Sequence, residues 1–153
     1  MNDNIFDSLT YDFIWETTTN LTIFGENYSV TLGIEDGEEI GITQIQKNSY
    51  YSLINNTNNI ISEIENSIFQ YYKKICDTEP ESIDSNVRDT LPNITDVHDM
   101  KQIVKPTNLC IPELDEDEEI SILFDCIWDF NLGMGIKIVN NKIIHVGVQN
   151  DVL

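Results

Sequence analysis

The sequence is poor in basic residues, cysteine and proline: its 153 residues include eight lysines and arginines, three cysteines and four prolines. So few bases offer little attraction to nucleic acid phosphates or anionic lipids, and direct binding to either is therefore not expected. The cysteines, Cys76, Cys110 and Cys126, are odd in number and contain no CxxC pair. Reduced thiols in a cytoplasmic protein are the simplest interpretation.

Long hydrophobic runs are also missing. No stretch approaches the ~20 consecutive apolar residues of a membrane-spanning helix. The first residues, MNDNIFDSLT, lack the basic start and apolar run of a signal peptide. Hydrophobic residues nevertheless make up 41% of the chain, which argues against general disorder. Length and composition therefore predict one domain, residues 1–153, with its own hydrophobic core.

Negative charge is what the sequence has in excess. Its 27 aspartates and glutamates give a formal net charge of −19 and a pI near 4.1. Such a surface attracts cationic partners and speeds their encounter at low salt. It also favours solubility, because acidic surfaces resist association. Acidity alone leaves both interpretations open.

The first third of the chain has the alternating pattern of β-strands. Residues 11–15 (YDFIW) and 28–34 (YSVTLGI) place large apolar side chains at every second position. Residues 21–24 (LTIF) also predict a strand, and residues 25–27 predict a hairpin loop after it. The polar residues 35–39 (EDGEE) end this segment in a turn.

The apolar spacing becomes helical after Thr43. Thr43 and Gln46 form a capping-box pattern, which predicts a helix over residues 44–54. The asparagines of residues 55–59 (NNTNN) favour a turn. In the second helix that follows, Glu63 and Glu65 lie near the start and suit the helix dipole. The apolar face of this helix comprises Ile60, Ile64, Ile68, Tyr71 and Ile75.

The next segment is polar and less regular. Residues 76–93 contain two prolines and predict a surface loop. A short third helix is expected with Thr95 as its cap and an end before Pro106. Residues 108–111 (NLCI) then predict a strand.

The last third again alternates as strands do. Residues 120–128, 135–139 and 142–148 each have a strand pattern. Asn140-Asn141 suits a type I′ hairpin between the last two, because asparagine tolerates positive φ. The sequence therefore predicts an α+β fold: an antiparallel sheet with strands from both chain ends, packed against a helical pair and one short third helix.

Few residues offer catalytic or metal-binding chemistry. The histidines, His98 and His145, lie at no metal-ligand spacing from a cysteine, and no G-x-S-x-G pattern presents a nucleophilic serine. We therefore expect no metal, no cofactor and no catalytic residue. The alternative is a small ligand-binding domain or enzyme with a pocket near Trp128, Asp129 and His145.

Two acidic segments are candidates for contact with a basic protein. The run at residues 113–119 is not an EF-hand loop, because Ile120 stands where a loop beginning at Asp115 needs glycine. Since the run borders a predicted strand, its carboxylates are expected on a rigid frame, where they could pair with lysines and arginines. The candidate partner-binding residues are Glu113, Asp115, Glu116, Asp117, Glu118 and Glu119, together with Glu35, Asp36, Glu38 and Glu39.

The segment WDFNLGMG, residues 128–135, is a further candidate. Its Gly-Met-Gly precedes a strand pattern, whereas a phosphate-binding loop leads into a helix. The local chemistry predicts a turn, in which aspartate bonds nearby amides and glycine permits unusual backbone geometry. The residues of this structural motif are Trp128, Asp129, Gly133, Gly135, Gly147 and Asp151. A binding surface at the same place is the alternative.

This C-terminal segment resembles the signature of a family of small bacterial domains of unknown function, with the pattern Trp-Asp-x-x-x-Gly-x-Gly. The segments ITQIQKNSYYSL and IFQYYKK resemble the family's middle helices. The family often has glutamate where this chain has Asn131, so no role of that carboxylate is carried over. Members of this kind often resemble immunity proteins, which are antidotes to secreted toxins.

The resemblance implies a non-enzymatic protein that binds a cognate toxin domain. The negative charge favours a basic partner, and a toxin that acts on nucleic acid would have a basic site. An inhibitor that mimics nucleic acid is a third possibility.

Overall fold

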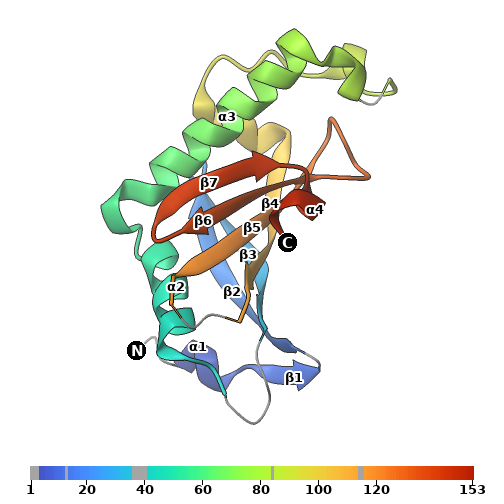
Figure 1. Cartoon of the computed structure of the whole chain (residues 1–153). Helices are drawn as coiled ribbons and strands as arrows, with labels where there is room; N and C mark the ends of the chain where they lie inside the picture. Colours follow the sequence, from blue (N-terminus) through green and yellow to red (C-terminus); the bar gives the residue numbers. More distant parts are fainter. Residues whose placement is uncertain (1–3, 13, 36–40, 84, 114–115) are drawn as a thin grey trace.

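The computed structural model describes residues 4–12, 14–35, 41–83, 85–113 and 116–153 (Figure 1). The strands in this part of the chain are β1 (Thr10–Asp12), β2 (Ile14–Ile23), β3 (Glu26–Ile34), β4 (Val104–Ile111), β5 (Glu119–Cys126), β6 (Met134–Val139) and β7 (Lys142–Gly147). The α-helices are α1 (Asn4–Asp7), α2 (Gln44–Ile54), α3 (Ile60–Thr78) and α4 (Gln149–Val152). Short 3-10 helices are η1 (Thr57–Asn59), η2 (Pro80–Ser82), η3 (Arg88–Thr90) and η4 (Val97–Gln102).

The strands form one sheet in the order β1-β2-β3-β4-β5-β6-β7, so that neighbours in sequence are neighbours in space. Every pair is antiparallel except β3 and β4, which are parallel. A parallel pair needs a long crossover, and the segment that holds α2, α3 and η4 provides it. The predicted α+β fold is confirmed, with this parallel pair as a correction to the all-antiparallel expectation.

The helices cover the two faces of the sheet unequally (Figure 1). Side chains of α2 and α3 share one core with alternate residues of the central strands, among them Ile136 of β6. Its neighbour Gly135 points to the opposite face, where α4 places Val152 against it. Among the described residues, no helix has the length and apolar character needed to cross a membrane.

The predicted strand at residues 11–15 is wrong, because the chain reverses there. Tyr11 of β1 lies opposite Trp15 of β2 in an antiparallel pair. Both arms of such a reversal alternate in the same way, so the pattern reads as one continuous strand.

The hairpin between β2 and β3 is also tighter than predicted. Its turn consists of Phe24 and Gly25, with φ angles of 56° and 75°, and the predicted loop residue Glu26 already belongs to β3. Positive φ at both turn residues is the type I′ geometry that suits the twist of a hairpin.

The predicted first helix and its cap are confirmed in α2. The backbone N–H of Gln46 donates to Oγ1 of Thr43 at 3.2 Å, and Oε1 of Gln46 accepts from the N–H of Thr43 at 3.0 Å. The asparagine turn follows, with Asn56, Asn58 and Asn59 at positive φ.

The apolar face of α3 is confirmed with one change: Tyr72 is buried, whereas Tyr71 is only half-buried. Glu63 lies in the first turn of α3, as predicted. Glu65 is a correction, because it is buried in the second turn.

The predicted third helix differs in type and length. It is the 3-10 helix η4, and Asp96 caps it in place of Thr95, its side chain accepting from the N–H of His98 at 3.0 Å. Strand β4 begins at Val104 and therefore contains Pro106. The pairing with β5 shifts register directly after this proline, at the kind of bulge where a residue without an N–H is tolerated.

The predicted strands of the last third and their hairpin are confirmed, except that β5 ends at Cys126 and the predicted strand residues 127 and 128 form a turn. Asn140 and Asn141 form the turn between β6 and β7 with φ angles of 49° and 61°. In β5 both faces are buried around Ile122 and Leu123, because α4 covers the side that α2 and α3 leave open.

Candidate functional site

The two predicted acidic segments begin side by side at one edge of the sheet. Nε2 of Gln46 donates to the carbonyl oxygens of Glu35 and Pro112, at 2.7 and 2.8 Å. The backbone N–H of Glu35 also donates to the carbonyl of Ile111 at 2.8 Å. Since β3 and β4 are parallel, their carboxyl ends meet here. Glu35 follows β3 directly, and Glu113 follows β4 after Pro112. The parallel pair thus joins two segments that lie far apart in sequence.

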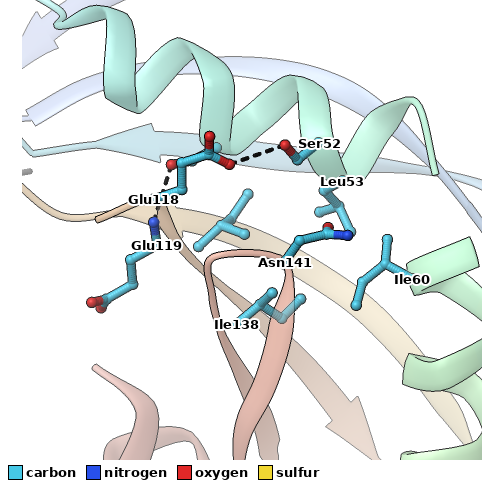
Figure 2. Close-up of a pocket in the computed structure, with 9 residues that line it drawn as sticks. Ser52, Leu53, Ile60, Glu118, Glu119, Ile138 and Asn141 are labelled. Atoms are coloured by element: carbon cyan, nitrogen blue, oxygen red, sulfur yellow. Dashed lines mark hydrogen bonds between the residues drawn. The ribbon is translucent and has the colours of Figure 1, made fainter. Parts of the chain in front are cut away.

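The second acidic segment is held by neighbouring side chains (Figure 2). The carboxylate of Glu118 accepts from the hydroxyl of Ser52 on α2 at 3.0 Å. The backbone N–H of Glu119 donates to the hydroxyl of Ser49 at 3.1 Å, and Nζ of Lys137 lies 3.7 Å from Oε2 of Glu119. These contacts fix the end of the acidic run against α2 and β6.

Asn140 of the β6–β7 turn adds two more contacts to this run. Its Oδ1 accepts from the N–H of Glu118, and its Nδ2 donates to Asp117, both at 3.1 Å. Glu113 and Glu116 are exposed. Four further predicted contacts lie outside the described residues: Asp36, Glu38, Glu39 and Asp115. We call Glu35, Glu113 and Glu116–Glu119 the acidic edge.

The cavity behind the acidic edge is too small for a metabolite. Its volume is about 10 Å³, and Ser52, Leu53, Ile60, Ile138 and Asn141 are among the residues that line it (Figure 2). A cavity of that size holds about one water molecule. Within the described part of the chain, the space behind the edge is therefore no larger than a water molecule, and Glu113 and Glu116 are exposed to solvent.

The Trp-Asp segment forms a tight, packed corner after β5. Trp128 is 1% exposed and packs against Tyr72 of α3, with 4.9 Å between ring centroids. Oδ1 of Asp129 accepts from the N–H of Leu132 at 3.0 Å, and the N–H of Gly133 donates to the carbonyl of Asp129 at 3.0 Å. The geometry is that of an aspartate-capped turn.

The glycines of this segment lie where α4 approaches the sheet. A β-carbon at Gly135 would lie 2.5 Å from Cγ2 of Val152. One at Gly147 would lie 2.9 Å from Nε2 of His145 and 3.1 Å from Oδ2 of Asp151. These glycines therefore allow the C-terminal helix to pack closely.

The residues proposed for an alternative pocket have separate partners. Nε2 of His145 lies 3.8 Å from Oδ2 of Asp151, with both side chains about half exposed. Asp129 instead bonds the backbone of its own turn, and Trp128 is enclosed in the core. Within the described part of the chain, no group of three or more histidine, cysteine, aspartate or glutamate side chains is placed to hold a metal ion.

Glu65 is a structural residue that the sequence interpretation misplaced. Its Oε2 accepts from the N–H of Phe24, in the β2–β3 turn, at 2.6 Å, and its Oε1 lies 3.7 Å from Nε2 of His98. The carboxylate thereby satisfies a turn amide that the hairpin leaves unpaired. In the sequence, Glu65 directly follows Ile64 and stands three residues before Ile68, so it lies beside the apolar face of the helix. This position was the signal that could have predicted its burial.

Tyr71 lies close to carboxylates from three parts of the chain. Burial raises the pKa of its hydroxyl to about 12, and the nearby negative charges of Cys126 in its thiolate form, Asp129, Glu79 and Asp151 add to the shift. Both causes disfavour the tyrosinate. The two aspartates belong to the Trp-Asp segment and α4, and Glu79 follows α3.

This shift predicts a late step in the alkaline titration. Tyrosinate absorbance should show a phase near pH 12 that disappears in Tyr71→Phe. Because the native pKa lies above the ordinary value of 10.0, the stability contributed by Tyr71 is complete below pH 10 and is lost as pH rises toward 12. Urea unfolding across this range measures the loss. An unchanged absorbance titration in Tyr71→Phe would contradict this account.

Comparison with protein-family models gives a match over residues 5–153, to a family described as domain of unknown function (DUF6985). No curated protein and no solved structure matched the chain. The match covers nearly the whole chain, including the acidic edge and the Trp-Asp segment at residues 128–135. The chain therefore belongs to the DUF6985 family.

Proposed function

We propose that this protein is a non-enzymatic binding protein, an immunity-type antidote that neutralises a basic toxin domain by covering it. The observation that carries the proposal is the uncompensated negative surface. The net charge is −19, and Glu65 is the one buried acid among the described residues. Within the same residues, two lysines pair with carboxylates within 4.0 Å, Lys101 with Glu26 and Lys137 with Glu119.

The acidic edge is the surface that we propose for the first contact. Gln46 joins its two segments, and hydrogen bonds from Ser52 and Asn140 hold its second half. Carboxylates on such a frame lose less conformational freedom when a partner binds. Each exposed ion pair contributes only ~0–1 kcal/mol, so the edge serves mainly to steer a basic partner and fix its orientation.

Inhibition would follow from occupancy of the partner's active site. If the toxin cleaves or modifies nucleic acid, its site must attract phosphates, and carboxylates of the antidote would take their place. The proposed role requires no bond making or breaking by this chain. A non-enzymatic role is supported by the separate partners of Asp129 and His145, which do not converge on one site.

Binding to the product of the neighbouring gene tests the proposal. We expect nanomolar affinity that weakens as salt rises, because exposed charges are screened. The variant Glu113→Gln/Glu116→Gln should slow association by about threefold to tenfold. The control Glu81→Gln/Asp89→Gln also removes two exposed acids but lies away from the edge, so its association rate should change little.

Two results would reject the proposal. One is no binding between the two purified gene products. The other is turnover of a metabolite by the purified protein that is lost in His145→Ala, which would favour the enzyme alternative. Competition by duplex DNA for the bound partner would identify nucleic acid mimicry as the mode of inhibition.

A further inference from the structure

In the described part of the chain, the exposed large hydrophobic side chains all occur late in the sequence, between residues 130 and 153. They are Phe130 (66% exposed), Leu132 (48%), Ile144 (57%) and Leu153 (68%). Two of these residues stand in the single turn between Asp129 and Gly133. Exposed apolar groups that gather in this way mark an interaction site more often than scattered ones do.

The turn presents Phe130 and Leu132 on a rigid support. Asp129 caps the N–H of Leu132 at 3.0 Å, and the N–H of Gln149, in α4, donates to the carbonyl of Leu132 at 3.2 Å. The side chain of Gln149 also donates to the carbonyl of Phe124 at 2.9 Å. A surface fixed before binding has a smaller entropic cost to overcome.

Carboxylates adjoin this apolar turn. Asp129 belongs to it. Asp151 lies in α4, two residues after Gln149. The negative charges of both aspartates also help to raise the pKa of the Tyr71 hydroxyl. We call Asp129–Gly133 and Asp151, which follow Trp128 in the chain, the Trp-Asp corner.

We infer that the Trp-Asp corner docks a cationic segment of the partner, with an arginine or lysine among the carboxylates and a neighbouring apolar side chain on Phe130 and Leu132. The corner supplies the apolar anchor that exposed ion pairs alone do not. A second copy of this chain is a poor occupant, because each copy carries −19 and like charges would meet. The inference rests on the proposed function and assigns it a docking surface.

Short peptides test the corner directly by NMR of the ¹⁵N-labelled full chain. Acetyl-Arg-Leu-Arg-Leu-Arg-amide should give its largest amide shifts at residues 129–133 and at Asp151. Replacing each leucine of the peptide by glycine should weaken binding at least threefold, and replacing each arginine by glutamate should abolish it. Comparison of the three peptides therefore separates the apolar contribution to binding from the ionic contribution.

Variants of exposed residues complete the test. Phe130→Ser/Leu132→Ser should weaken binding of the leucine peptide at least threefold, whereas Ile144→Ser should leave it unchanged. Ile144 is a matched control, because it is 57% exposed and lies in β7, outside the turn. Dispersed amide spectra of each variant establish that it is folded.

The inference is overturned if the largest shifts fall on the acidic edge, or if the leucine and glycine peptides bind alike. It is also overturned if the neighbouring gene product binds tightly and keeps its affinity for Phe130→Ser/Leu132→Ser, in which case the proposed function stands without the corner. Failure of that protein to bind the native chain rejects the proposed function itself, while peptide binding at the corner would still identify a site for cations.

Discussion

Replacing Trp128 by alanine is expected to lower the free energy of unfolding by about 3–5 kcal/mol. The indole is 1% exposed and packs on Tyr72 with ring centroids 4.9 Å apart. The substitution removes this buried surface and leaves a cavity between α3 and the end of β5. Urea unfolding followed by circular dichroism measures the change.

The neighbouring Phe130 provides the control. Phe130→Ala also truncates an aromatic ring two residues along, but that ring is 66% exposed, so its effect should stay within about 0.5 kcal/mol. An equal decrease in the free energy of unfolding in the two variants would contradict the assignment of Trp128 to the core and Phe130 to the surface.

Replacing Gly133 by alanine should destabilise the protein by about 2–5 kcal/mol, for two separate reasons. The residue has φ of 58°, in the left-handed region where a β-carbon is unfavourable. The added carbon would also lie 2.7 Å from the carbonyl oxygen of Phe124 and 2.5 Å from Nε2 of Gln149. Relief of this clash requires the Gln149 side chain to leave its place against the turn and the turn itself to move away from the backbone of β5.

Gly25→Ala separates the two causes. Gly25 has φ of 75°, and a β-carbon there would meet nothing within 4 Å. The Gly25→Ala variant should therefore lose only the stability that depends on backbone conformation, about 1–2 kcal/mol. If Gly133→Ala costs no more than Gly25→Ala in parallel urea unfolding, the close packing of α4 on the turn is not a source of stability.

Both variants also bear on the docking inference. Trp128 and Gly133 fix the turn that presents Phe130 and Leu132, and both residues are themselves buried. A binding defect in these two variants should therefore follow their loss of structure. The defect in Phe130→Ser/Leu132→Ser should occur without such a loss.

The sequence was most informative where structure is local. The helix at residues 44–54 has the predicted bounds and capping box, because a cap is a contact between residues three apart. The Asn140-Asn141 hairpin was equally predictable, since two left-handed residues determine a type I′ turn.

Contacts over long distances in sequence could not be predicted in the same way. The apolar alternation of residues 28–34 and 108–111 is the same whether two strands run parallel or antiparallel. Glu65 fits a helix surface by its local neighbours, and only the approach of the Phe24 turn gives its buried carboxylate a partner.

The candidate site likewise has features that the sequence predicts and features that depend on the tertiary structure. The count of acids, the two acidic segments and the turn chemistry of Trp128–Gly135 all follow from the order of residues. Composition determines the sign of the surface charge, and short-range spacing determines caps and turns. In contrast, the approach of Glu35 to Pro112, the residue before Glu113, depends on parallel β3–β4 pairing, and the approach of Asp151 to the turn at residues 129–133 depends on the packing of α4 against it. The tertiary structure alone decides these placements, because burial of a shared core, and no local preference, brings the distant segments together.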